Sequence, residues 1–442
     1  MTLARVQIGL MAAIAATCPV SIFAAQVFLA LAVIVYLARL VTGRARLARL
    51  ALDGPMLAFA VWTLLSASFS PDPVESYENA KKLVLFALVP LMVDASSEER
   101  DRERILDAAL LGGIVLCTGT LLQFYFLGYD TIERRPRSFL GHYMTAAGMA
   151  MGTLVLAAGR AAFRRSSWAL PTREDLVRLA VLAGALAGLT TLQAWDLFAL
   201  EGERLFVASL AAAAAYMTLS RGVWPGPATS ATLTLLALPI GAWALVLSQT
   251  RNAWLGAVAG IALVILLRAP RALWLLPAGL GAFLLLRPGL VMGRLTVTDP
   301  ASVDRYYMWQ AGVDMIREKP VFGQGPGMIL QVYPDYRWPQ APNPRAPHLH
   351  DNALQIAAER GLPCLAWWLW LVAAALGDAY REARKGLFGP GWAAAASMAV
   401  VVAVMAAGLF EYNFGDSEVL MFTLLAMALP YGLRRQRSGV AV

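Results

Sequence analysis

Charged residues are scarce in this chain of 442 residues. Asp, Glu, Lys and Arg together make up 15% of it, whereas hydrophobic residues make up 59%. Soluble domains carry about 25% charged residues, so the composition excludes an ordinary water-soluble protein. The net charge is +8, but the arginines fall in short connections between apolar segments. That distribution is typical of membrane orientation rather than of a nucleic-acid-binding patch, and we expect no nucleic acid partner.

Cysteine and histidine are also scarce, with three residues of each. Cys18, Cys117 and Cys364 all fall in apolar segments, and their spacing fits neither a disulfide framework nor a metal site. We interpret them as small buried hydrophobic residues. The scarcity of histidine makes its placement informative, because His348 and His350 stand together where the long polar stretch of the chain ends.

Apolar sequence is abundant. About fourteen segments approach the roughly 17–25 residues that a helix needs to cross a bilayer, although several are short. Because lipid offers no partners to backbone polar groups, such continuous runs predict helices. The segments lie approximately at 5–18, 21–42, 53–70, 79–95, 102–127, 139–160, 174–195, 204–220, 229–248, 250–268, 271–287, 352–377, 391–412 and 417–433. The sequence therefore predicts an all-α polytopic membrane protein of about 12–14 transmembrane helices surrounded by membrane lipids.

Basic residues mark one side of this predicted bundle. They gather around residues 39–49, 160–173, 268–271, 381–385 and 434–437. Positive charge accumulates on the cytoplasmic side of membrane proteins, so both termini are predicted to be cytoplasmic. The long polar stretch then lies outside. We expect three parts: a transmembrane bundle at 1–287, an external loop with amphipathic helices at 288–351, and C-terminal transmembrane helices at 352–442.

Arginines at the opposite, external side need another explanation. Arg137 and Arg305 lie in two external connections, and Arg251 begins an apolar segment whose N-terminal end faces outside. Arginine fits phosphate oxygens two at a time, and a helix N-terminus carries a partial positive charge of about half a unit. These residues predict a phosphate site at the outer rim of the membrane. Pairing with the phosphates of outer-leaflet lipids is the alternative.

The histidine pair stands just before the first of the C-terminal helices. His350 can accept a proton near neutral pH, so it is the candidate general base. Asp351 is a natural N-cap for the helix that follows. His348 either supports His350, contacts the substrate or has no role. Arg204 and Glu411 reach the outer face at segment ends and are weaker candidates, since they could equally snorkel or form pairs.

The long loop has two further features. Residues 302–319 predict an amphipathic helix, with Tyr306, Trp309, Val313 and Ile316 on one face, that would lie along the membrane surface. The glycine-rich stretch at 323–327 lacks the preceding strand and the lysine of a phosphate-binding loop. We interpret it as a flexible turn.

Five stretches together resemble a known family. They read RPRSFLGHYMTAAG from Arg135, SQTRNAWLGA from Ser248, RYYMWQAGVDMIREKPVFGQGPG from Arg305, HLHDNALQIAAERGLP from His348 and FEYNFGDSEV from Phe410. In order and spacing they are similar to the bacterial O-antigen ligases, which share a superfamily with O-antigen polymerases. The sequence departs from the family pattern at Asp351, where Asn, Ser or Gln is usual, and at Cys364, where Gly is frequent.

The resemblance implies a C-type glycosyltransferase-like helical fold in the inner membrane of a Gram-negative bacterium. It implies an inverting transfer, without cofactor or metal, of O-antigen polysaccharide from undecaprenyl diphosphate to lipid A–core oligosaccharide at the periplasmic face. His350 would be catalytic, and Arg137, Arg251 and Arg305 would bind the diphosphate. His348, Asp351, Arg204 and Glu411 would contact substrate or support the site.

Several alternatives stay open. O-antigen polymerase and protein O-oligosaccharyltransferase need the same arginines and histidine, and they differ in the acceptor. A polytopic transporter or flippase is a different class, and such proteins keep ionisable residues near the bilayer midplane. Here the polar groups gather at the outer rim, which favours chemistry at the membrane surface.

Overall fold

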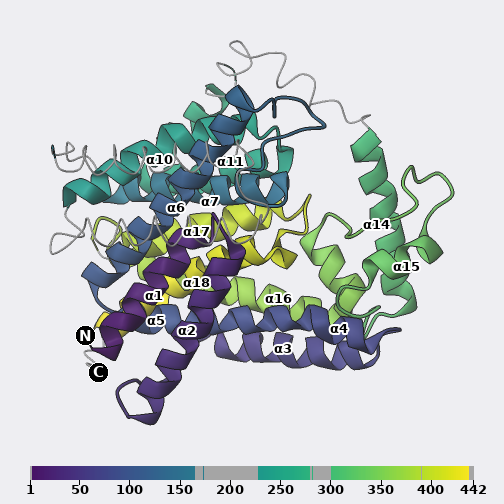
Figure 1. Cartoon of the computed structure of the whole chain (residues 1–442), viewed down its shortest axis with the longest axis horizontal. Coiled ribbons are helices and arrows are strands. Elements are labelled where there is room, and N and C mark those ends of the chain that lie inside the picture. Colours follow the sequence, from purple (N-terminus) through teal and green to yellow (C-terminus); the bar gives the residue numbers. More distant parts are fainter. Residues whose placement is uncertain are drawn as a thin grey trace, which may run out of the picture.

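The computed structural model describes residues 2–164, 173, 227–278, 281, 300–389 and 391–437. Every regular element within these ranges is a helix, which confirms the predicted all-α polytopic membrane class. The long helices lie side by side in one bundle, and the described residues nearest the two termini lie at the same end of that bundle (Figure 1).

The helices fall before and after the long gap between residues 173 and 227. Before it come α1 (Leu3–Thr17), α2 (Ile22–Val41), α3 (Asp53–Ser68), α4 (Pro73–Ala80), η1 (Lys81–Ala87), α5 (Leu88–Ala95), α6 (Glu99–Phe126) and α7 (Tyr143–Phe163). After it come α10 (Pro227–Leu247), α11 (Arg251–Arg268), η3 (Pro270–Trp274), α14 (Pro300–Glu318), α15 (Ile329–Tyr336), α16 (Asn352–Arg384), α17 (Trp392–Ala407), η4 (Asn413–Gly415) and α18 (Ser417–Arg437).

Six of the described helices are long and apolar enough to cross a membrane. They are α2, α6, α7, α10 from Thr229, α11 and α16. Helices α1 and α17 are apolar but shorter. Most of these eight helices begin and end within a few residues of the bounds predicted from the sequence. The predicted segments at 174–195 and 204–220, together with Arg204, lie outside the described residues.

Two predicted segments differ from the structure. The run predicted at 79–95 is divided among the end of α4, η1 and α5. Pro90 lacks an N–H and cannot continue a helix from the preceding turn, but it is tolerated in the first turn of α5. The segment predicted at 391–412 ends as a helix at Ala407, and Gly408 begins a loop that carries Glu411.

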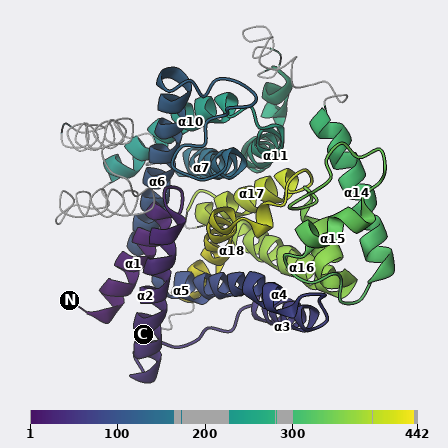
Figure 2. The same cartoon turned by 45° about the vertical axis from the view of Figure 1, so that its right-hand side comes forward.

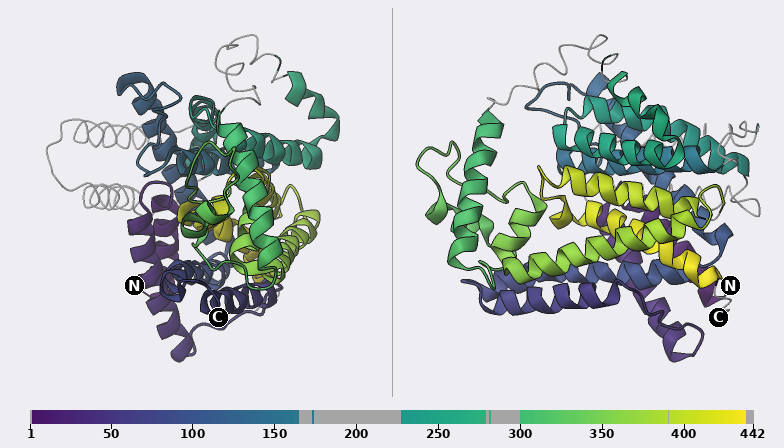
Figure 3. Two further views of the ribbon diagram at one scale, coloured as in Figure 1. Left: turned by 90° about the vertical axis from the view of Figure 1, so that its right-hand side faces the viewer. Right: turned by 180° about the vertical axis from the view of Figure 1, so that it is seen from behind.

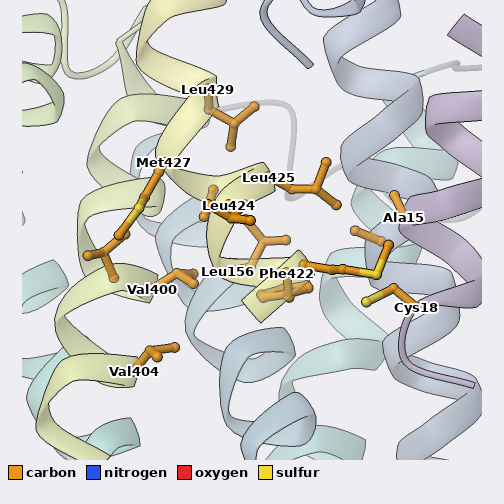
Figure 4. Packing of buried hydrophobic residues seen from close by; sticks show 14 of the residues in the cluster. Ala15, Cys18, Leu156, Val400, Val404, Phe422, Leu424, Leu425, Met427 and Leu429 are labelled. Carbon is orange, nitrogen blue, oxygen red and sulfur yellow. The ribbon is translucent and has the colours of Figure 1, made fainter. Parts of the chain in front are cut away.

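The core of the bundle surrounds α18. Figure 4 shows Phe422 and its neighbours in α18 enclosed by Leu156 of α7, Val400 of α17 and Cys18 at the end of α1. A helix covered on all sides needs apolar residues on every face, which explains why α18 is apolar from Val419 to Leu433 except at Thr423, whose hydroxyl donates to the Val419 carbonyl within the helix. All three cysteines are buried and free, which confirms their interpretation as core residues.

Helix α14 lies across the end of the bundle opposite the chain termini, with α15 beside it (Figures 1, 2 and 3). Tyr306 and Val313, which the sequence places on the apolar face, are exposed there. A second apolar face, formed by Met308, Ala311 and Met315, packs on α15 in a small core separate from that of the bundle. Because α14 is apolar on two faces, a single stripe read from the sequence describes only one of them.

Helix α16 is broken at Gly361, near the end of the bundle that α14 covers. Gly361 has φ 82° inside α16, and a Cβ there would lie 1.9 Å from the carbonyl oxygen of Val321. The N–H of Leu362 donates to the Pro320 carbonyl at 2.8 Å rather than within the helix. Only glycine fits this conformation and this close approach.

The glycine-rich stretch at 323–327 docks on α16 just before the break. The N–H of Gly325 donates to the Glu359 carbonyl at 2.8 Å, and the N–H of Gly327 donates to the Glu359 carboxylate at 3.0 Å. The stretch is a turn, as its sequence predicts. Because these N–H groups are engaged by α16, the turn is not a cradle for phosphate.

Candidate active site

His350 and Glu411 form a hydrogen-bonded pair at the end of the bundle that α14 covers. His350 ends the loop before α16, and Glu411 lies in the loop between α17 and α18. The His350 Nδ1 atom lies 3.0 Å from Oε2 of Glu411. Their side chains are 16% and 9% exposed. The pair is therefore sheltered, yet the imidazole is open to a substrate.

The charge of Glu411 fixes the proton on His350. Burial alone would raise the pKa of Glu411, but the hydrogen bond to His350 and the charges of His350, His348 and Arg305 lower it. Glu411 is therefore ionised at neutral pH and can only accept. The Nδ1 atom of His350 must donate, which leaves the lone pair of a neutral imidazole on Nε2. This tautomer is the one that a general base requires.

His348 lies against the same carboxylate. Its Nε2 atom is 3.5 Å from Oε1 of Glu411, and its ring centroid is 4.1 Å from that of His350. Burial lowers the pKa of His348 to about 4, although the charge of Glu411 acts in the opposite direction. His348 is therefore neutral at physiological pH. Its Nδ1 atom is buried without a hydrogen-bond partner among the described residues.

Asn352 holds the two loops together. Its backbone N–H donates to the Gly408 carbonyl at 2.8 Å, and its side chain donates to Asn413 at 2.7 Å and accepts from the Phe414 N–H at 3.0 Å. Asn352 is buried, so all three bonds are shielded from water. They keep His350, two residues earlier, in register with the loop that carries Glu411.

The backbone is strained at positions next to the predicted site residues. Within the described ranges three non-glycine residues have positive φ: Ser138 at 53°, Gln249 at 51° and His350 at 53°. Ser138 follows Arg137, and Gln249 stands two residues before Arg251. Such conformations cost about 1–3 kcal/mol and gather at functional sites. All three positive-φ residues therefore stand at or within two residues of residues predicted for the site.

Asp351 caps α16, as its sequence position predicts. Its Oδ1 atom accepts from the Leu354 N–H at 2.7 Å. Burial raises the pKa of Asp351, which means that the surroundings disfavour a negative charge there. Asp351 therefore serves by its shape and acceptor oxygen, properties that asparagine shares.

The Asp351→Ala variant is expected to lose about 0.5–2 kcal/mol of stability because α16 loses its N-cap. The measurement is the thermal unfolding midpoint of the purified protein in detergent. Asp351→Asn is the matched control and should unfold close to the wild type. A loss in the Asn variant as large as that in the Ala variant would show that the charge, rather than the cap, matters.

Helix α14 brings two of the predicted arginines together. Arg251 begins α11 and donates from Nη2 to Ser302 Oγ of α14 at 3.2 Å. Arg305 is one turn further along α14, on the same side as Ser302. The charge of Arg305 acts on both His348 and Glu411. Its Nε atom is buried without a hydrogen-bond partner among the described residues.

Arg251 and Leu349, the residue before His350, both bond to α14. Trp309 of α14 donates from Nε1 to the Leu349 carbonyl, next to His350, at 3.0 Å. Ser302 and Trp309 are seven residues apart, or about 10 Å along a helix. Arg251 and the residue before His350 therefore bond to α14 about two turns apart, at the same end of the bundle.

Arg137 lies in the same region but bonds within its own loop. Its N–H donates to Gln123 at 2.9 Å, and its guanidinium donates to the Gly141 carbonyl at 3.4 Å. Among the described residues no contact joins it to His350. The arginine of this loop that acts on the site is Arg135, whose charge reaches His142.

His142, the third histidine, also belongs to this site. It is the N-cap of α7 and accepts through Nδ1 from the Met144 N–H at 3.4 Å. Burial lowers the pKa of His142, and the charges of Arg135 and His350 lower it further. The charges of Glu411 and Asp416 raise this pKa, but the net shift is downward. The neutral ring therefore carries its proton on Nε2, which makes it a hydrogen-bond donor.

Residues 233–369 match the family model described as O-antigen ligase. This stretch of the chain is similar to that family. The match contains Arg251, Arg305 and the His348–His350 pair, and it leaves Arg137 and Glu411 outside. A search of curated proteins finds no relative that matches this chain.

Sequence reasoning missed three residues of this candidate site. Arg135 and His142 stand in a stretch that resembles the family, and the position of His142 just before an apolar helix was a signal for a cap. Asn352 follows the histidine motif directly, but nothing in the sequence indicates a bond to a loop about sixty residues away. Glu411 was identified only as a weaker candidate because its partner is equally distant in sequence.

Proposed function

We propose that this protein transfers O-antigen polysaccharide from undecaprenyl diphosphate to a sugar hydroxyl of lipid A–core oligosaccharide. The transfer is inverting and needs no metal. It takes place at the periplasmic face of the Gram-negative inner membrane, and both termini are cytoplasmic. The observation that supports it is the His350–Glu411 pair, with the charge of Arg305 acting on Glu411 and with Arg251 bonded to the same helix, α14.

His350 activates the acceptor in this mechanism. Its Nε2 atom takes the proton of the acceptor hydroxyl while the hydroxyl oxygen attacks the anomeric carbon. The bond from that carbon to the diphosphate oxygen breaks, and its electron pair stays on the diphosphate. Attack from the face opposite the leaving group inverts the anomeric centre. Glu411 stabilises the imidazolium that forms, and the proton then passes to water.

Arg251 and Arg305 offset the charge that develops on the departing diphosphate. Arg251 bonds to Ser302 of α14, one turn before Arg305, and the charge of Arg305 acts on His348 and Glu411. Fixed cations in a sheltered site stabilise such charge without reorganising during the reaction. This is the role that a metal ion has in many other glycosyl and phosphoryl transferases. Arg135 and the Nε2–H group of His142 are placed to support it.

Arg251→Lys is expected to lower kcat/KM for transfer about tenfold or more, because an ammonium lacks the planar fork that binds two phosphate oxygens. The measurement is steady-state transfer with a lipid-linked donor. Arg268→Lys, at the other end of α11, is the matched control and should keep wild-type activity. Full activity in Arg251→Lys would leave Arg251 with the role of a point charge.

The direct test is a reaction of the purified protein in detergent with lipid-linked donor, candidate acceptors and a chelator. Transfer to lipid A–core oligosaccharide supports the ligase. Products elongated on the lipid-linked glycan would indicate a polymerase, and transfer to a protein hydroxyl would indicate a protein O-oligosaccharyltransferase. Absence of any transfer, or transfer that stops when the chelator is added, would contradict the proposal.

A further inference from the structure

Three potential metal ligands converge at the mouth of the site. His348, His350 and Glu411 each offer one ligand atom, and these atoms all lie within 4.8 Å of one another. The side chains of His348 and His350 are 24% and 16% exposed, so an ion can reach them. They come from two loops that Asn352 ties together, which means that the set is built into the fold.

The ligand types suit a transition metal, and their spacing is near that of a bound ion. Zinc bonds to histidine nitrogen and to carboxylate oxygen are about 2.0–2.2 Å long, which places tetrahedral ligand atoms about 3.4 Å apart. The structure has 3.0 Å from His350 Nδ1 to Glu411 Oε2 and 3.5 Å from His348 Nε2 to Glu411 Oε1, so each imidazole faces a different oxygen of the carboxylate, and one ligand atom from each residue lies within 4.8 Å of the other two. Two imidazoles and one carboxylate favour Zn²⁺ and similar ions over Mg²⁺ and Ca²⁺, which prefer oxygen ligands.

We propose that His348, His350 and Glu411 form a Zn²⁺-binding site and that the zinc-bound protein is inactive in transfer. The zinc site does not depend on the proposed function, whereas the inhibition rests on that function. Zinc binding would make this end of the bundle sensitive to transition metals, although the reaction needs none.

The tautomer of His350 explains why zinc inhibits. In the zinc-free protein Glu411 holds the proton on Nδ1, and Nε2 is free to accept one. Zinc takes the Nδ1 lone pair, so the Nδ1 proton leaves to water and Nε2 acquires a proton from water. The imidazole stays neutral overall. Its remaining nitrogen is then a donor and cannot deprotonate the acceptor hydroxyl.

Calorimetric titration of ZnCl₂ into the purified protein, produced without a histidine tag, tests the site. One equivalent is expected to bind, and MgCl₂ is expected to give no binding. His348→Ala and Glu411→Gln should each lower the zinc affinity about tenfold or more. His142→Ala, which removes the one histidine outside the set, is the matched control and should bind zinc as the wild type does. Equal affinity in all three variants would overturn the proposal.

Transfer assays test the inhibition separately. Saturating zinc should lower the transfer rate about a hundredfold or more, since it removes the base, and a chelator should restore it. His348→Ala, compared with its own zinc-free rate, should need more zinc for the same inhibition. Zinc-stimulated transfer, or undiminished transfer at saturation, would overturn the proposal while leaving the transferase function intact. Zinc binding by a protein without transfer would instead refute the function and keep the site.

Discussion

His350→Asn is expected to lower the rate of glycan transfer about 10²–10⁴-fold, the usual contribution of a positioned general base. Asparagine has no group that accepts a proton near neutral pH. It does tolerate the positive φ of 53° that His350 adopts, so the turn before α16 should keep its shape. The measurement is the initial rate of transfer by purified protein, normalised to the amount that elutes as folded protein in size-exclusion chromatography.

His350→Ala provides the comparison that separates chemistry from folding. Alanine removes the imidazole and also fits a positive φ less well than asparagine. Both variants should lose transfer to the same extent, while only the alanine variant should unfold at a lower temperature. High activity in the asparagine variant would mean that His350 shapes the turn and takes no part in proton transfer.

Glu411→Gln is expected to lower the transfer rate about 10²–10⁴-fold although it changes a single atom. The carboxylate accepts from His350 Nδ1 at 3.0 Å, whereas an amide can donate its N–H to that nitrogen and favour the tautomer with the proton on Nε2. The same change in the Ser-His-Asp triad costs about 10⁴ in kcat for this reason. The measurement is kcat, with KM determined in parallel.

Glu411→Asp is the matched variant for this prediction. It keeps an acceptor-only carboxylate, shorter by one methylene, so activity should fall less than in Glu411→Gln. The effect should appear in kcat more than in KM, because the tautomer matters when the proton moves. Equal losses in the Asp and Gln variants, confined to KM, would indicate that Glu411 binds the acceptor and does not orient His350.

The membrane helices could be predicted from the sequence because each is determined by its own composition. Runs such as those of α6 and α11 are apolar over the length of a bilayer, and lipid leaves a helix as the only solution for the backbone. The details that escaped prediction depend on contacts between distant segments. At Gly361 the backbone approaches Val321 closely, and the second apolar face of α14 packs on residues of α15 and α16 that are distant in sequence.

The site residues that could be predicted from the sequence are those that stand next to a predicted helix boundary. His350 and Asp351 precede a helix start, and Arg251 begins another, so their positions follow from the helix boundaries. The convergence of these ends could not be read from the chain, because it depends on Asn352, on Glu411 and on the bond from Arg251 to α14. The structure brings Arg251, Arg305, His348, His350 and Glu411 to one end of the bundle. It leaves Arg137 bonded within its own loop.

The transfer rate of the double variant His350→Asn/Glu411→Gln, set beside both single variants, tests most directly whether the two residues act as one unit. Residues that work only together give losses that do not multiply. The double variant should therefore lose about as much as the more damaged single variant. If the two losses multiply, the fold-loss of the double variant equals the product of the two single fold-losses. That result would contradict a shared role in moving the acceptor proton.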